Sequence, residues 1–267
     1  ARGILVNQLT GWESEGLDPA TWQAAPTVFE RARAEGRPTF AVGVAAYAAS
    51  GFTRATLRGA EFVAAQTPAE RVEVAYDLAE SHPGSLIYCY LPEADKAGHR
   101  YGLDSVQWVS ALEEIDAALS RRVPPGVGVL VTSDHGMVDV PVHRQVVLEA
   151  EHLDGVRHIG GEPRMLHVYV EPDADAAVVA ERWRRDLEGL ADVGTGQEAI
   201  ASGFFGPEVT SAAATRIGDV LVVARGNGAV YDGTAADQRG RGMIGQHGGL
   251  TPEERQVPLL RFGAFAR

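Results

Sequence analysis

The first half of the chain alternates between two hydrophobic patterns. Short runs that are apolar at nearly every position occur at residues 40–44, 86–91 and 127–132. Such runs are typical of strands buried on both faces of a sheet. Between them, apolar residues recur every three or four positions, which predicts helices over residues 28–36, 68–81 and 103–122. The alternation predicts an α/β fold with a mostly parallel sheet sandwiched by helices.

The hydrophobic pattern changes beyond residue 160. Residues 165–170 alternate apolar and polar positions as a strand does, and residues 174–190 carry a helical apolar stripe. A further apolar run follows at residues 220–224. We therefore expect a small α+β cap subdomain at roughly residues 160–225, inserted into one domain that extends over residues 1–267.

Composition and charge restrict the classes of partner. The 267 residues are 45% hydrophobic and 22% charged, as in ordinary globular proteins. The formal net charge of -12 argues against a nucleic-acid polymer, because phosphate backbones bind basic surfaces. A small phosphorylated substrate remains compatible, since bound divalent metals reverse the local field. No apolar run reaches the length of about 18 residues that a membrane span needs, so no membrane partner is expected, and the oligomeric state stays open.

Cys89 is the single cysteine of the chain, which excludes an intrachain disulfide. It lies in one of the apolar runs, where a buried and inert thiol is the expected role. A single thiol and the lack of a recognisable targeting segment favour a cytoplasmic location.

Aspartate and histidine residues stand directly after the predicted strands. Asp95 and His99 follow one strand, in a segment expected to form a loop, and Asp134 and His135 follow another. His247 lies near the C-terminus, flanked by glycines. Open α/β sheets bind ligands beyond the carboxyl ends of their strands, and carboxylates and neutral imidazoles suit Zn²⁺, Mn²⁺ or Fe²⁺. The residues by themselves leave two interpretations open, namely a metal site or polar side chains that are solvated or cap helices.

Other candidate residues have weaker surroundings. Arg164, in the segment Gly-Gly-Glu-Pro-Arg-Met, either bridges the insertion and the core or contacts a substrate. The remaining histidines are expected to be structural or exposed: His82, His143, His152, His158 and His167.

Three motifs resemble those of the nucleotide pyrophosphatase/phosphodiesterase family (type I phosphodiesterases) of the alkaline phosphatase superfamily. Residues 90–102 read Tyr-Leu-Pro-Glu-Ala-Asp-Lys-Ala-Gly-His-Arg-Tyr-Gly, and residues 131–137 read Val-Thr-Ser-Asp-His-Gly-Met. Residues 245–248 read Gly-Gln-His-Gly. Their order and separation also fit that family, and the resemblance extends over residues 85–260.

The resemblance implies a site with two divalent metal ions, in this family Zn²⁺. Asp95, His99 and His247 match the ligands of one zinc, and Asp134 and His135 match two ligands of the other. The family completes the second zinc with another Asp and supplies a Thr or Ser nucleophile, both upstream of the first motif.

No residue here matches either of those upstream groups. The hydroxyl residues near the start lack the expected strand–Asp and Thr–helix context: Thr10, Ser14, Thr21 and Thr27. The catalytic nucleophile is therefore unassigned, and the chain is expected to lack the N-terminal part of the family domain. By itself it should bind one metal well and a second poorly, with little or no turnover.

The resemblance implies metal-dependent hydrolysis of phosphodiester or pyrophosphate bonds in a small phosphorylated substrate. Hydrolysis of a phosphonate, as in phosphonoacetate hydrolase of the same superfamily, is the alternative closest in chemistry. A non-catalytic metal-binding pseudoenzyme is an alternative from another class. The pattern does not identify the natural substrate.

Overall fold

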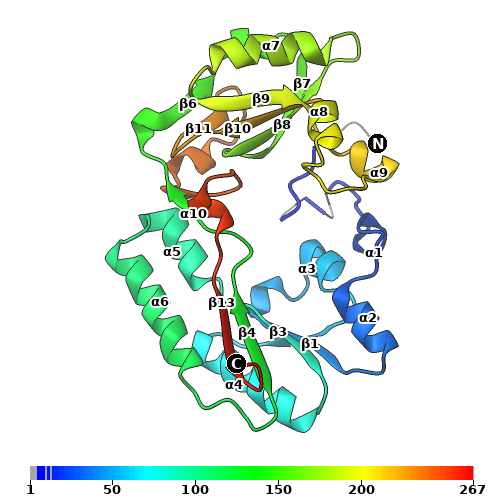
Figure 1. The fold of residues 1–267 in the computed structure, drawn as a ribbon, viewed down its shortest axis with the longest axis vertical. Helices are drawn as coiled ribbons and strands as arrows, with labels where there is room; N and C mark the ends of the chain where they lie inside the picture. Colours follow the sequence, from blue (N-terminus) through cyan, green and yellow to red (C-terminus); the bar gives the residue numbers. More distant parts are fainter. Residues whose placement is uncertain (1–4, 10, 13, 267) are drawn as a thin grey trace. The chain divides into compact units, whose positions relative to one another are not determined.

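The computed structural model describes residues 5–9, 11–12 and 14–266 (Figure 1). Contacts divide the chain into two compact units. The parallel-sheet unit comprises residues 6–94, 109–131 and 259–266, apart from the undescribed positions. The antiparallel-sheet unit comprises Leu5 and residues 95–108 and 132–258. Within the described ranges, no helix has both the length and the apolar character needed to cross a bilayer.

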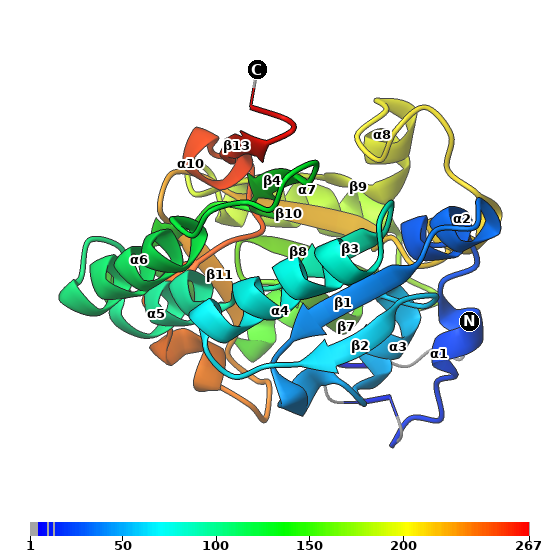
Figure 2. The same ribbon diagram turned by 90° about the horizontal axis from the view of Figure 1, so that it is seen from below.

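Three parallel strands form the centre of the parallel-sheet unit (Figure 2). Strand β1 (Thr39–Gly43) pairs with β2 (Glu61–Ala64) on one side and with β3 (Leu86–Cys89) on the other. Every residue of β1 is buried, as the apolar run predicts for a central strand. A second ladder joins β4 (Gly128–Thr132) to β13 (Leu259–Gly263).

Helices α2 and α4 pack against β1. Their first turns follow directly from the sequence: Thr27 and Thr67 each form a capping box with a glutamate three residues later, and Pro68 occupies the first turn of α4. The predicted helices over residues 28–36, 68–81 and 103–122 are confirmed. The helices in this part of the chain are α1 (Pro19–Trp22), α2 (Val28–Ala34), α3 (Gly51–Thr56), α4 (Pro68–Ser81) and α6 (Val106–Leu119).

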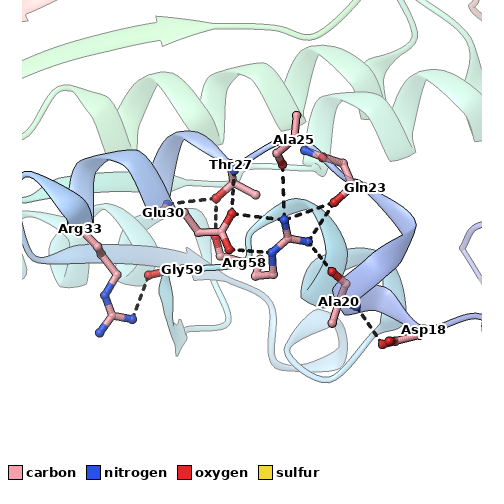
Figure 3. A network of polar contacts seen from close by, with 9 residues as sticks. All are labelled: Asp18, Ala20, Gln23, Ala25, Thr27, Glu30, Arg33, Arg58 and Gly59. Carbon is pink, nitrogen blue, oxygen red and sulfur yellow. Dashed lines mark hydrogen bonds and ion pairs between the residues drawn. The ribbon is translucent and has the colours of Figure 1, made fainter. Parts of the chain in front are cut away.

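Arg58 ties the start of α2 to the segment before it (Figure 3). Its Nε donates to Glu30 Oε1 at 2.7 Å, and its terminal nitrogens donate to the carbonyls of Ala20, Gln23 and Ala25. Glu30 is also the capping-box residue of α2, so one carboxylate serves both the helix end and the arginine. The network thus joins the segment before α2 to the start of that helix.

The prediction that all three apolar runs are buried on both faces is wrong for β3 and β4. Tyr88 is 42% exposed and Leu130 is 55% exposed. Among the described residues, β3 pairs only with β1, and β4 pairs only with β13. An apolar run indicates a strand that suits a buried sheet, but it does not reveal whether a second neighbour covers the strand.

A four-stranded antiparallel sheet forms the centre of the other unit, in the order β7-β8-β10-β9. Helix α7 (Ala176–Asp186) covers one face, and Trp183 is buried there with Val168 and Val220 (Figure 1). The strands over 165–170 and 220–224 and the helix within 174–190 are confirmed. The strands are β7 (Val156–Glu162), β8 (Met165–Val170), β9 (Ala191–Thr195) and β10 (Val220–Ala224).

Short elements complete the antiparallel-sheet unit. Strand β12 pairs antiparallel with β5, and β11 pairs parallel with β6. The expected cap subdomain at roughly 160–225 falls inside this unit, and its boundaries as a subdomain stay a prediction. The remaining elements are β5 (Val138–Asp139), β6 (Gln145–Leu148), α8 (Gly196–Ala201), α9 (Ser211–Ala214), β11 (Ala229–Asp232), β12 (Gly245–Gln246) and α10 (Pro252–Arg255).

The segment with Asp95 and His99 is a helix, which corrects the expectation of a loop. Helix α5 extends over Glu93–Tyr101 and begins directly after Pro92. Gly102 follows its last residue, and the φ of 84° at Gly102 lies in the left-handed region that favours glycine. The next residue, Leu103, donates its backbone N–H to Asp139 Oδ1 at 2.9 Å, which fixes the exit of the chain from the helix.

Candidate metal centre

Helix α5 places Asp95 and His99 one turn apart on the same face. The Asp95 Oδ1 atom lies 3.4 Å from His99 Nε2. The helix therefore explains physically why a spacing of four can bring one carboxylate and one imidazole to a common point.

His247 joins this pair from far along the sequence. The ligand atoms of Asp95, His99 and His247 all lie within 4.8 Å of one another. Strand β12 ends at Gln246, directly before His247. His99 Nδ1 hydrogen-bonds the carbonyl oxygen of Gly245 at 2.8 Å. Since a carbonyl only accepts, the hydrogen of His99 resides on Nδ1, and the Nε2 lone pair is free for a metal.

One oxygen of Asp95 tests whether these residues fit a metal ion. Asp95 Oδ1 is buried, and no described residue donates a hydrogen bond to it. An unsatisfied buried polar atom costs about 1–3 kcal/mol. A divalent cation held by this carboxylate and by two imidazoles would compensate that cost. The donor set of Asp95, His99 and His247 therefore fits a metal such as Zn²⁺.

Asp134 and His135 lie beside this cluster. The His135 ring stacks on the His247 ring, with centroids 3.6 Å apart and an interplanar angle of 14°. His135 Nδ1 hydrogen-bonds the Gly136 carbonyl at 2.9 Å, so its Nε2 is also free. That Nε2 lies 3.7 Å from Asp134 Oδ1, and the Asp134 side chain is 80% exposed. The second motif thus places two candidate ligand side chains beside the cluster, and one of them, Asp134, is mostly exposed.

The pKa of His247 is lowered to about 4. Burial is the largest cause, and the neighbouring His135 and His99 add to it, while Asp95 and Asp134 act in the opposite direction. At neutral pH the His247 ring is therefore uncharged, which is the state that binds a metal.

Glu162, at the end of β7, is a carboxylate near this site that the sequence analysis did not single out. A Cβ built on Gly248, the residue after His247, would lie 3.1 Å from Glu162 Cβ. Although Glu162 is at the surface, surrounding protein atoms partly desolvate its carboxyl and raise its pKa, and His99 and His135 oppose this rise. No sequence pattern distinguishes it from other exposed glutamates.

The hydroxyl residues near the start of the chain have local structural roles. Thr27 caps α2, Thr21 Oγ1 donates to the carbonyl of Asp18, and Ser14 Oγ donates to the carbonyl of Gly11. Thr10 lies outside the described residues. These contacts indicate that Ser14, Thr21 and Thr27 help to order the chain.

Arg164 is structural, which resolves the alternative left open above. It is 0% exposed and forms an ion pair with Glu254. Two of the other histidines accept backbone hydrogen bonds: Gly218 N–H donates to His167 Nδ1 at 3.0 Å and Glu149 N–H donates to His152 Nδ1 at 3.0 Å.

Comparison with known proteins bears out the resemblance to the type I phosphodiesterase family. A family model described as type I phosphodiesterase / nucleotide pyrophosphatase matches residues 6–250. Among curated proteins, a phosphopentomutase of Sinorhizobium medicae (strain WSM419) is 34% identical over 118 residues, which are 42% of this chain and 27% of that protein. The chain thus spans about a quarter of the length of that relative.

Two solved structures are similar in fold. Phosphonoacetate hydrolase from Sinorhizobium meliloti 1021, in complex with phosphonoacetate, has a TM-score of 0.67 and 19% identity, covering 97% of this chain and 74% of that one. Murine ectonucleotide pyrophosphatase / phosphodiesterase 5, inactive and in complex with AMP, has a TM-score of 0.63 and 17% identity, covering 92% of this chain and 65% of that one. At these identities they establish the fold alone, an α/β fold of the alkaline phosphatase type.

Proposed function

The chain belongs to the type I phosphodiesterase / nucleotide pyrophosphatase family, which is a family of hydrolases, and we propose on this basis that it carries the metal centre of an enzyme that hydrolyses phosphodiester or pyrophosphate bonds. The observation that carries the proposal is the convergence of Asp95, His99 and His247, with a buried Asp95 oxygen that no described residue satisfies. Carboxylate and imidazole ligands are those that hydrolytic zinc sites use.

The proposed centre holds two divalent metal ions, Zn²⁺ in each case. Asp95, His99 and His247 would hold one ion, and Asp134 and His135 would contribute to the site of the other. When bound, the ions would polarise a phosphoryl oxygen and stabilise the charge that develops during hydrolysis.

Three features of the protein would prepare this centre. The Gly245 carbonyl orients the His99 ring and fixes its tautomer. Burial keeps His247 uncharged near neutral pH, since its pKa is lowered to about 4. The stacking of His135 on His247 keeps the two motifs at a short and defined separation.

A small phosphorylated molecule is the proposed substrate class. The net charge of -12 disfavours a long polyanion, whereas two divalent cations offset the charge of one phosphoryl group locally. Phosphonate hydrolysis is the second candidate, because the similarity to phosphonoacetate hydrolase covers 97% of the chain.

A substrate comparison in the presence of Zn²⁺ tests the proposal. The full-length product of the gene would be incubated with bis-p-nitrophenyl phosphate, p-nitrophenyl phosphate and phosphonoacetate, with and without a chelator, because little or no turnover is expected of this chain by itself. We expect hydrolysis to require Zn²⁺ and to be faster for the diester than for the monoester. Asp95→Asn should reduce the rate by about 100-fold or more, because a metal ligand is lost. The matched control is His143→Gln, which changes an exposed histidine.

The other outcomes separate the alternatives. Faster turnover of phosphonoacetate than of the diester would favour phosphonate hydrolysis. Zinc binding without turnover of any substrate would favour a non-catalytic metal-binding protein. Hydrolysis that survives both the chelator and Asp95→Asn would contradict a metal-dependent mechanism at these residues.

A further inference from the structure

A buried ion pair between Arg164 and Glu254 lies inside the antiparallel-sheet unit. The side chains are 0% and 1% exposed. Arg164 Nε donates to Glu254 Oε1 at 2.9 Å, and Arg164 Nη2 donates to Glu254 Oε2 at 2.6 Å. This two-point geometry fixes both the distance and the orientation of the carboxylate. Such pairs are costly to desolvate, so additional hydrogen bonds are needed to satisfy the remaining lone pairs.

The carboxylate of Glu254 receives those bonds from the loop that carries His247. Gly249 N–H donates to Glu254 Oε1 at 2.8 Å, two residues after His247. Thr251 donates to Glu254 Oε2 through its hydroxyl at 2.8 Å and its N–H at 3.2 Å. A Cβ on Gly249 would lie 2.7 Å from Glu254 Oε2, so the loop approaches the carboxylate as closely as a glycine permits.

The backbone of Glu254 contacts the other metal-binding loop, which carries Asp134 and His135. Gly136 N–H donates to the Glu254 carbonyl at 2.8 Å, one residue after His135. A Cβ on Gly136 would lie only 1.9 Å from the carbonyl oxygen of Glu253. The loop with Asp134 and His135 is therefore pressed against the backbone of α10 at a position that admits glycine alone.

Arg164 connects this junction to the sheet. It stands in the turn between β7 and β8, and its Nη1 donates to the carbonyl of Gly228. Its own carbonyl accepts from Ala224 N–H at 2.9 Å, at the end of β10. The guanidinium is thus held at Gly228, between β10 and β11, and the carboxylate that it orients contacts the loop with Gly249 and Thr251.

We propose that the buried Arg164–Glu254 pair positions the two metal-binding loops relative to each other. Glu254 hydrogen-bonds both loops, through its side chain to Gly249 and through its carbonyl to Gly136. Neither Arg164 nor Glu254 belongs to the proposed ligand set, so each is a positioning residue. The proposal rests on the proposed function in so far as the positioned side chains bind metal.

The first experiment measures Zn²⁺ affinity by competition with a chromophoric chelator. Glu254→Gln keeps the shape of the side chain but weakens its bonds to Arg164. We expect Zn²⁺ affinity to fall by about 10–100-fold at a temperature where the variant is fully folded, since residues that orient metal ligands have effects of this size. The matched control is Asp192→Asn, which breaks an exposed ion pair with Arg225 in the same unit and should leave Zn²⁺ affinity unchanged.

The second experiment needs no metal. Hydrogen exchange of the metal-free protein would be followed at the amides of Gly136 and Gly249. We expect Glu254→Gln to increase exchange in both loops, and Asp192→Asn in neither. Because Arg164→Met alone leaves a buried charge and can unfold the protein, the double variant Arg164→Met, Glu254→Met removes the pair without that charge and should show the same loosening of both loops.

The two experiments separate failure of this proposal from failure of the proposed function. If the unaltered chain binds no Zn²⁺ but both loops loosen together in Glu254→Gln, the metal function fails and the positioning role stands. If folded Glu254→Gln and the double variant keep normal exchange in either loop, the positioning role is overturned. If the unaltered chain binds Zn²⁺, an unchanged Zn²⁺ affinity in folded Glu254→Gln and in the folded double variant would also overturn the positioning role.

Discussion

At the scale of residues, backbone hydrogen bonds leave one possible metal-binding atom free on His99 and one on His135. The carbonyls of Gly245 and Gly136 take the Nδ1 hydrogens of His99 and His135, which leaves Nε2 of each ring available. Asp95 keeps one buried oxygen without a donor among the described residues. These free atoms carry lone pairs, and a metal ion accepts lone pairs. The arrangement therefore suits a bound metal ion.

Gly136→Ala tests how tightly the second motif is packed. The added Cβ would lie 1.9 Å from the Glu253 carbonyl oxygen, so either the loop or α10 must move. We expect a loss of about 1–3 kcal/mol in the free energy of unfolding, measured by urea denaturation. Gly242→Ala is the matched control, because nothing lies within 4 Å of its added Cβ. Equal effects of the two substitutions would show that the close approach at Gly136 is absent in solution.

At the scale of elements, the sequence predicted most helices and strands correctly. It did not predict α5 or the exposure of β3 and β4. The capping residue Thr67 and Pro68 define the start of α4 locally, so its bounds were predictable. Glycines and a proline around Asp95 and His99 favoured a loop, although the intervening residues form α5. The exposed faces of β3 and β4 were not predictable, because burial depends on neighbours that the pattern of one strand does not contain.

The roles of Arg164, Glu162 and Glu254 required the three-dimensional structure. Glu254 carries a local signal as the capping-box residue of α10, but that signal does not indicate its contacts with Arg164 and Gly249. In contrast, the ligands at the three motifs could be proposed from sequence because each motif is short and chemically distinctive. A contact between residues far apart in the sequence, such as Arg164 and Glu254, has no comparable motif around either residue.

Strand β3 contains the single thiol of the chain, and its reactivity tests the environment of that strand. Burial raises the pKa of Cys89 to about 11, with Glu93 adding to the rise and Arg71 opposing it. Because the thiolate is the reactive form, we expect alkylation by iodoacetamide at pH 8 to be about 100-fold slower in the native protein than in urea. The protein in urea is the internal reference. Equal rates in the two states would mean that Cys89 is not desolvated in the folded protein.

At the scale of the whole molecule, the proposed ligands all belong to one compact unit. The antiparallel-sheet unit contains Asp95, His99, Asp134, His135 and His247, although they come from three separate parts of the sequence. A metal that binds only the folded unit raises its free energy of unfolding. Once the free metal concentration exceeds the dissociation constant, this gain grows with the logarithm of their ratio. Metal binding and the stability of this unit should therefore be linked.

The central claim is that Asp95, His99 and His247 form a metal site, and a calorimetric titration of the metal-free chain with Zn²⁺ tests it most directly. We predict one tight site, which Asp95→Asn and His247→Ala abolish, and one weaker site, which His135→Ala abolishes. His143→Gln, at an exposed histidine, should leave both sites intact. Absence of Zn²⁺ binding, or a tight site that persists in both Asp95→Asn and His247→Ala, would contradict the claim.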